Sequence, residues 1–189
     1  MTAPTIYVAS SWRNEIQPQV VVALRLAGFD VYDFKDPKND KGAFKWSDLG
    51  IDRPEDWSPQ QCVEFLAHPR AEEGFRQDFD AMRRSAACVL VLPAGRSANL
   101  EAGRFVGQGR PLVVLKDWGC PDLMYKMATR VVTTVDEAVK AVRDEFPPAF
   151  KWPVDACPVC GADGVVDADE SALFCARCGR TYSVDGEAI

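Results

Sequence analysis

The chain has 189 residues, of which 47% are hydrophobic, enough for one well-buried domain with a small appendage. Its formal net charge of -6 argues against a surface that neutralises a phosphate backbone, so nucleic acid is not an expected partner. No run of eighteen apolar residues occurs, and the opening residues, MTAPTIYVASSW, lack the basic and apolar regions of a secretory leader. A cytoplasmic protein without a membrane anchor is therefore expected.

From the N-terminus onward, short apolar β-rich segments alternate with segments in which apolar residues recur at helical spacing. Strands are predicted at residues 5–9, 29–34, 87–92, 111–115 and 130–134. Helices are predicted at residues 14–27, 59–67, 70–85, 99–107 and 135–146. This alternation predicts an α/β domain, a flavodoxin-like five-stranded parallel sheet of order 2-1-3-4-5 with helices on both faces. Ligands bind such sheets at the carboxyl ends of the strands.

A polar stretch from Lys35 to about Ser58 interrupts the alternation and is longer than an ordinary connection in a compact domain. Loops of this length often act as lids over a site. The tryptophans of this stretch, Trp46 and Trp57, are expected to close over the site and exclude water.

The loop and helix at residues 93–103, PAGRSANLEAG, carry the sharpest chemical signal. Asn99 is the expected N-cap, which places Glu101 in the first turn, near backbone N–H groups that favour an ionised carboxylate. An ionised carboxylate beside a sugar anomeric carbon can form a covalent glycosyl intermediate. The alternative is that Glu101 merely interacts with the positive end of the helix dipole.

Three segments resemble those of one enzyme family: IYVASSWR at residues 6–13, DFDAM at residues 78–82 and ANLEAG at residues 98–103. In this order and spacing they are similar to the nucleoside 2-deoxyribosyltransferase family and its hydrolytic relatives, the 2'-deoxynucleoside 5'-phosphate N-hydrolases. The resemblance covers residues 5 to about 146.

The resemblance implies that Glu101 is the nucleophile that captures the sugar C1', that Asp78 handles the base or the 5' end, and that Tyr7 orients Glu101. Residues 122–124, Asp-Leu-Met, are similar to a family segment that reaches into the active site of a neighbouring subunit. The resemblance therefore also implies a homo-oligomer.

The sequence departs from the family at Gly95, where the transferases have an acid and the phosphate-requiring hydrolases a serine. Arg96 and Ser97 can take over there, and Arg13 matches the phosphate-binding arginine of the hydrolases, so a 5'-nucleotide substrate is plausible. The alternative for both arginines is solvated surface charge.

The aromatic residues Trp12 and Phe34 are candidates for an apolar floor under a planar base, with an ordinary core role as the alternative. The complete set of candidate substrate-binding residues is Ser10, Ser11, Trp12, Arg13, Phe34, Gly95, Arg96, Ser97, Asn99, Asp122 and Met124.

Four of the seven cysteines form two C-x-x-C pairs, Cys157 with Cys160 and Cys175 with Cys178. Two residues between ligands let both thiolates of a pair reach one tetrahedral ion, which predicts a structural Zn²⁺ with no open coordination position. Two redox or disulfide pairs are the alternative. Acidic residues outnumber basic ones around the pairs, so this zinc ribbon is expected to pack against the enzyme domain or a partner protein.

Three regions are thus predicted: an α/β domain at residues 1–146, a proline-rich linker at 147–155 and a zinc ribbon at 156–189. The predicted function is cleavage of an N-glycosidic bond of a nucleoside or nucleoside 5'-phosphate, with transfer of the sugar to another base or to water and no organic cofactor. Two alternatives stay open: a non-catalytic sensor of a nucleotide-derived ligand whose ribbon binds a protein, and an NAD glycohydrolase.

Overall fold

The computed structural model describes residues 3–37, 42–50, 57–116, 119 and 122–146, together with the backbone of three short strands nearer the C-terminus. The chain forms two compact units, residues Met1–Phe146 and Pro147–Ile189. Each unit is described by itself.

Unit 1 contains a five-stranded sheet whose strands are all parallel to their neighbours. The strands are β1 (Thr5–Ala9), β2 (Asp30–Asp33), β3 (Ala87–Val91), β4 (Leu112–Leu115) and β5 (Arg130–Val132). They lie in the order β2-β1-β3-β4-β5, which confirms the predicted flavodoxin-like order. Tyr7 of β1 pairs with Tyr32 of β2 on one side and with Cys88 of β3 on the other.

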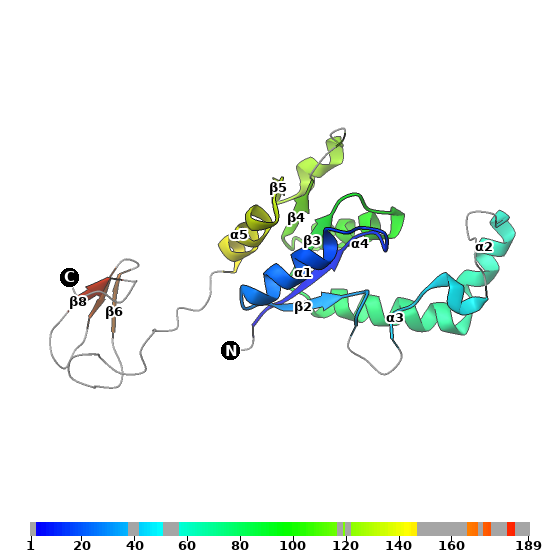
Figure 1. Cartoon of the computed structure of the whole chain (residues 1–189), viewed down its shortest axis with the longest axis horizontal. Helices are drawn as coiled ribbons and strands as arrows, with labels where there is room; N and C mark the ends of the chain where they lie inside the picture. Colours follow the sequence, from blue (N-terminus) through cyan, green and yellow to red (C-terminus); the bar gives the residue numbers. More distant parts are fainter. Residues whose placement is uncertain are drawn as a thin grey trace. The chain divides into compact units, whose positions relative to one another are not determined.

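Helices cover both faces of the sheet (Figure 1). The helices are α1 (Gln17–Leu26), α2 (Pro59–Leu66), α3 (Pro69–Arg84), α4 (Arg96–Gly107) and α5 (Val135–Glu145). Helices α1 and α5 pack on one face against valine and isoleucine side chains such as Val8 and Val89. Helices α3 and α4 pack on the other face against Tyr7 and Leu90. The period-two alternation of the strands therefore decides which side chains reach α3 and α4.

Helix α4 begins three residues earlier than predicted. Its N-cap is Gly95, in an extended conformation (φ -82°, ψ -177°), so the expected cap at Asn99 is wrong. The Asn99 amide instead donates to the Gly95 carbonyl from within the helix, at 2.9 Å. Glu101 consequently lies in the second helical turn, where the field of the helix terminus is weaker than in the first turn.

Helix α1 begins at Gln17, three residues later than predicted, because Asn14 makes a turn before it. The side-chain oxygen Oδ1 of Asn14 accepts hydrogen bonds from the backbone N–H groups of Ile16 and Gln17. Its amide nitrogen donates to the carbonyls of Val91 (3.3 Å) and Pro93 (3.1 Å). This buried side chain therefore ties the loop after β1 to the loop after β3.

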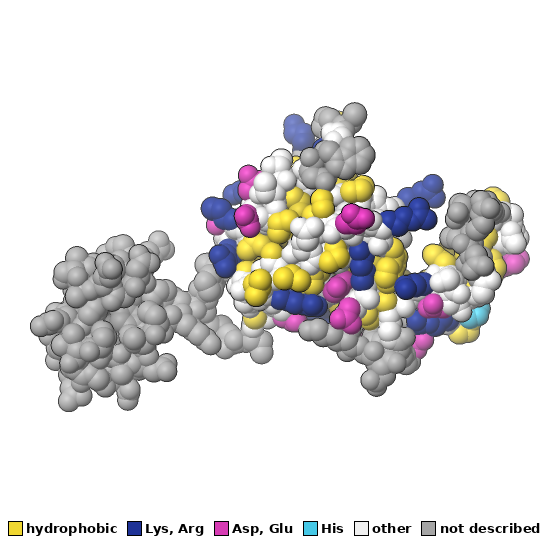
Figure 2. Space-filling model, in the orientation of Figure 1, with side chains coloured by type: hydrophobic (Ala, Val, Ile, Leu, Met, Phe, Trp, Pro, Cys, Tyr) yellow, Lys and Arg dark blue, Asp and Glu magenta, His cyan; other side chains and the backbone are white. Residues whose placement is uncertain are grey.

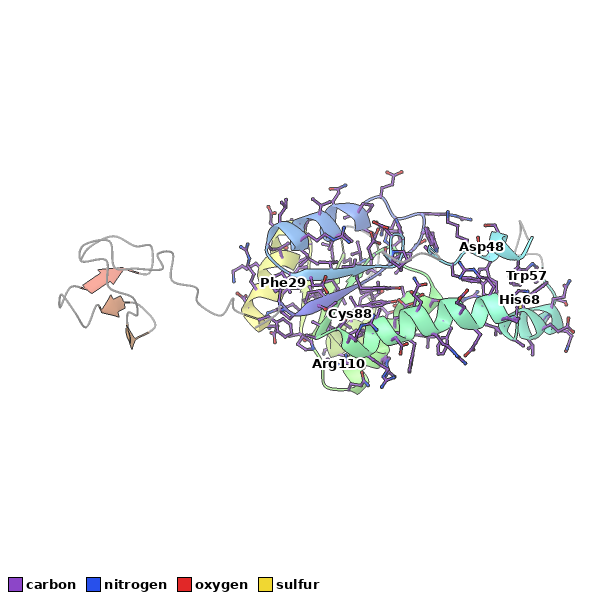
Figure 3. All side chains as sticks on the ribbon, turned by 90° about the horizontal axis from the view of Figure 1, so that it is seen from below. Phe29, Asp48, Trp57, His68, Cys88 and Arg110 are labelled. Atoms are coloured by element: carbon purple, nitrogen blue, oxygen red, sulfur yellow. The ribbon has the colours of Figure 1, made fainter. Side chains whose placement is uncertain are left out.

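Helix α3 extends beyond the sheet and carries α2 at its far end (Figure 1). His68 is the N-cap of α3, and its imidazole accepts from the Arg70 N–H. Part of the long polar stretch lies beside this end of α3 as a short 3₁₀ helix, η1 (Trp46–Leu49). Figure 3 shows Asp48, Trp57 and His68 together there, away from the sheet.

Acidic and basic side chains are intermixed over the visible face of unit 1 (Figure 2). None of the described helices is both long and apolar enough to span a membrane.

Unit 2 contains an antiparallel sheet of three strands in the order β6-β7-β8. These strands are β6 (Val166–Asp169), β7 (Ala172–Phe174) and β8 (Thr181–Ser183). The four predicted zinc ligands, Cys157, Cys160, Cys175 and Cys178, and the predicted linker at 147–155 lie outside the described residues.

Replacing Asn14 with alanine should lower the free energy of unfolding by about 3 kcal/mol, because several buried backbone groups lose their hydrogen-bond partner. Urea unfolding measures the loss. The matched control is Asn99→Ala, which removes an exposed asparagine and should change the stability by less than about 0.5 kcal/mol. Equal losses for the two variants would show that Asn14 does not hold the loops together.

Candidate active site

A cavity of about 900 Å³ opens at the carboxyl end of the sheet, between α3, α4 and η1. Its size is near the upper end of the range for small-molecule sites, roughly 300 to 1,000 Å³. The side chains that line it are Ser10, Trp12, Phe34, Phe44, Lys45, Trp46, Ser47, Leu66, Ala71, Glu72, Gly74, Phe75, Asp78, Phe79, Met82, Ser97, Leu100, Glu101 and Arg104.

Two helical stripes form part of the cavity wall. The residues that α4 contributes are Ser97, Leu100, Glu101 and Arg104, and those at the same spacing on α3 are Phe75, Asp78, Phe79 and Met82. Positions i, i+3, i+4 and i+7 lie on one side of a helix, so each set is a single stripe along its helix. The two stripes bring the carboxyl groups of Glu101 and Asp78 into one cavity.

Burial raises the pKa of the Glu101 carboxyl from 4.5 to about 7, the negative charge of Asp78 also raises it, and the Tyr7 hydroxyl lowers it. Near neutral pH both protonation states of Glu101 are therefore populated. The expectation that the helix N-terminus keeps Glu101 ionised is wrong, because the second-turn position gives little dipole stabilisation and desolvation dominates. A raised carboxyl pKa in a cavity is typical of catalytic sites.

Asp78 is fixed by hydrogen bonds that lead away from the cavity. The Tyr32 hydroxyl donates to Asp78 Oδ1 at 2.7 Å, and the Gln77 amide donates to the Tyr32 oxygen at 3.3 Å. Burial raises the pKa of Asp78, whereas the hydrogen bond from Tyr32 lowers it. With Oδ1 occupied by Tyr32, Oδ2 is the oxygen left to carry a proton or contact a ligand.

Tyr7 lies beneath the two carboxyl groups, fully buried in the sheet. Its ring stacks on Tyr32 with 5.3 Å between centroids. Its hydroxyl has no hydrogen-bond partner of normal geometry among the described residues, although it is close enough to Glu101 to lower the pKa of that carboxyl. Burial, with the charges of Glu101 and Asp78, raises the pKa of Tyr7, so this group is a proton donor throughout the neutral range.

Aromatic side chains form the wall near the loops after β1 and β2. Trp12 packs edge-on against Phe34 with 5.3 Å between ring centroids, and the Lys45 ammonium lies 5.0 Å from the Trp12 ring. Trp12 is 41% exposed and lines the cavity, so a core role does not describe it. Trp46 also lines the cavity, whereas Trp57 contacts Trp46 at 5.2 Å and is not on the wall.

A glycine of α3 anchors the segment that carries Lys45 and Trp46. A Cβ atom on Gly74 would lie 2.6 Å from the Phe44 Cβ, so only glycine lets Phe44 pack against the helix at this distance. Arg70 reinforces the contact, with its guanidinium 5.5 Å from the Phe44 ring and an ion pair to Asp48 at 3.2 Å. The described part of the predicted lid is thus packed against α3 in this structure.

Several predicted site residues lie off the cavity wall: Ser11, Arg13, Gly95, Arg96, Asn99, Asp122 and Met124. Arg13 and Arg96 are exposed, as expected of solvated surface charge. Asp122 caps the 3₁₀ helix η3 (Leu123–Met127) by accepting from the Met124 N–H, and both side chains are exposed. Their predicted insertion into a neighbouring subunit stays a prediction. Ser10, Trp12, Phe34, Ser97, Asp78 and Glu101 do line the cavity.

Several residues that line the cavity were not predicted from the sequence, among them Lys45, Phe75, Phe79 and Arg104. Phe75 and Arg104 were detectable, because each stands three residues from Asp78 or Glu101 on a predicted helix, and Phe79 stands four residues after Phe75. Lys45 lies in a stretch without periodicity. Within the described ranges, no three His, Cys, Asp or Glu side chains converge as a metal site would require.

No known protein-family model and no curated protein sequence matches the chain. Sixteen chains of solved structures match. One is a 2-deoxyribosyltransferase from Bacillus psychrosaccharolyticus, with 16% identity and a TM-score of 0.47 over 71% of this chain and 90% of that one. Another is the CMP N-glycosidase BcmB of Clostridium botulinum, with 13% identity and a TM-score of 0.39 over 73% of this chain and 97% of that one. These values are too low to assign the chain to a family or to transfer an activity.

Replacing Glu101 with glutamine should stabilise the protein at high pH more than at low pH. The folded pKa of about 7 exceeds the ordinary value of 4.5, so the folded state binds the proton more tightly and wild type loses stability as pH rises between these values. Over this pH range the free energy of unfolding of wild type should fall by on the order of 3 kcal/mol. Urea unfolding of wild type and Glu101→Gln at pH 5 and pH 8 measures it.

The matched control is Glu15→Gln, which alters an exposed glutamate outside the cavity and should give nearly the same stability difference from wild type at both pH values. If the Glu101→Gln difference is also independent of pH, the pKa of Glu101 is not raised.

Proposed function

We propose that unit 1 cleaves the N-glycosidic bond of a nucleoside or nucleoside 5'-phosphate and transfers the sugar to another base or to water. One observation carries the proposal: Glu101 and Asp78, both with raised pKa values, face one cavity that aromatic side chains line. Carboxyl pairs of this kind cleave glycosidic bonds, and aromatic rings favour a planar base.

In the proposed mechanism, two nearby carboxyl groups with raised pKa values hold one proton between them near neutral pH. The reactive form has the charge on Glu101 and the proton on Asp78. Tyr7 lowers the pKa of Glu101 and Tyr32 lowers that of Asp78, so it is the positive charge developing at C1' that draws the negative charge to Glu101. Tyr32 holds the carboxyl of Asp78 in place through Oδ1.

Glu101 attacks C1' and forms an ester bond to the sugar. The bond between C1' and the base nitrogen breaks, its electron pair goes to the nitrogen, and Asp78 protonates the leaving base. Water or a second base then attacks C1', its proton passes to Asp78, and the Glu101 carboxylate is released. Trp46 on the cavity wall limits water near C1', which favours transfer over hydrolysis.

The test is chromatography of free base released from nucleosides and their 5'-monophosphates, with and without a second base. Wild type should release or exchange base, and Glu101→Gln should lower the rate by about 10³-fold or more because the nucleophile is lost. Since the reactive form has one ionised and one protonated carboxyl group, kcat/KM of wild type should pass through a maximum with pH and fall as the pair loses its last proton.

Glu15→Gln is the control for this assay and should keep the wild-type rate. NAD belongs in the panel because a cavity of about 900 Å³ has room for a dinucleotide. If wild type binds members of the panel but turns none over, the protein is a sensor and the enzymatic proposal is wrong.

We also propose that Cys157, Cys160, Cys175 and Cys178 bind one structural Zn²⁺ in unit 2. The spacing of the two C-x-x-C pairs supports this, as does their sequence position, since the second pair falls between the neighbouring antiparallel strands β7 and β8. Four thiolates saturate a tetrahedral ion, so the ion would stabilise the fold and bind no substrate.

Elemental analysis of the purified chain should find close to one equivalent of zinc, because four thiolates form a closed site. Cys175→Ser should lose the metal. Cys62→Ser is the matched control, since Cys62 lies on α2 in unit 1, and it should retain the zinc. A zinc content that Cys175→Ser leaves unchanged would exclude the site.

A further inference from the structure

Arg104 is a cavity residue for which neither the fold nor the proposed chemistry accounts. It lies on α4 and lines the cavity, and its guanidinium stacks on the Phe79 ring at 4.3 Å. Its Nε atom is buried and has no hydrogen-bond partner among the described residues. A buried donor without an acceptor is unfavourable, and an acceptor on a ligand would remove that cost.

The charge of Arg104 is also not neutralised within the described part of the chain. Some arginines of unit 1 form ion pairs there, such as Arg70 with Asp48 and Arg76 with Glu72, whereas Arg104 is one that forms none. A guanidinium paired with Glu101 would lower the pKa of that carboxyl, whereas the pKa of Glu101 is raised. The cavity therefore presents a positive group that is separate from its carboxyl pair.

The position of Arg104 relative to Glu101 determines which part of a ligand it can reach. Residues three apart on a helix are neighbours on its surface, with about 5 to 6 Å between their Cβ atoms. A sugar whose C1' lies at Glu101 can therefore place a substituent of its 5' carbon against Arg104. The stack on Phe79 holds the guanidinium plane, so its N–H groups are oriented before a ligand binds.

We propose that Arg104 binds the phosphate of a nucleoside 5'-monophosphate and so makes nucleotides, rather than free nucleosides, the preferred substrates. This inference rests on the proposed function of the same cavity. It replaces the roles expected of Arg13 and Arg96, which are exposed and off the cavity wall. A planar guanidinium can donate two parallel hydrogen bonds to phosphate oxygens, which an ammonium cannot do with the same geometry.

Isothermal titration calorimetry of the full chain tests the proposal, with Glu101→Gln as the background so that no ligand is consumed. The ligands are the four common 2'-deoxynucleosides and their 5'-monophosphates. Adding Arg104→Gln should weaken the binding of the monophosphates about 10- to 100-fold and of the nucleosides less than about twofold. Arg13→Gln and Arg96→Gln remove the same charge off the cavity wall and should change neither affinity by more than about twofold.

Arg104→Lys keeps the charge without the planar fork and should give intermediate monophosphate affinity, which also guards against a folding defect in Arg104→Gln. The proposal is overturned if no monophosphate binds, if Arg104→Gln weakens both ligand classes equally, or if Arg13→Gln or Arg96→Gln has the larger effect. Base release by the chain with Glu101 intact separates the two proposals. Turnover that is independent of Arg104 leaves only the catalytic proposal standing. Arg104-dependent binding of monophosphates without turnover overturns catalysis and leaves Arg104 as the phosphate-binding residue of a ligand site.

Discussion

Glu101 and Asp78 share one partly buried cavity, and the free-energy cost of keeping two carboxyl groups there is the constraint on which the rest of unit 1 depends. Desolvation raises both pKa values, and the charge of Asp78 further raises the pKa of Glu101. Without a rigid surrounding, the two carboxyl groups would become protonated or turn toward water. The surrounding fold must therefore fix both side chains while giving them few hydrogen bonds.

The sheet supplies that rigidity through β1. This strand lies inside the sheet, between β2 and β3, and its residues from Ile6 to Ala9 are fully buried. Alternation along the strand turns Tyr7 toward α3 and α4, where it reaches the carboxyl pair. Asn14 then bonds to the end of β3 and holds the loops after β1 and β3 at a fixed separation. The positions of the residues at the site thus depend on β1, which is buried inside the sheet.

The sequence predicted the sheet almost completely because a buried parallel strand is a short, apolar and distinctive signal. It also predicted Glu101, Asp78, Trp12 and Phe34 as cavity residues. The start of α4 was wrong because Asn99 is a good N-cap by type, whereas a glycine in extended conformation has no side-chain signal to mark it. Arg13 and Arg96 illustrate another limit. An arginine in a loop or at the start of a helix can point to solvent or to a ligand, and its sequence neighbours do not decide between them. The helical spacing from Glu101, in contrast, does place Arg104 on the cavity wall.

The segment around Phe44 shows why the far wall of the cavity could not be predicted. Glycine inside a helix destabilises it by about 1 kcal/mol relative to alanine, so Gly74 within α3 is unfavourable by local propensity. The cost is offset by packing, since only the missing side chain lets Phe44 approach α3 and bring Lys45 and Trp46 to the cavity. Gly74 and Phe44 are thirty residues apart and neither belongs to a motif, so their contact becomes visible only in three dimensions. Two features therefore shape the cavity: a periodic sequence pattern places its carboxyl groups, and a single close contact places Lys45 and Trp46.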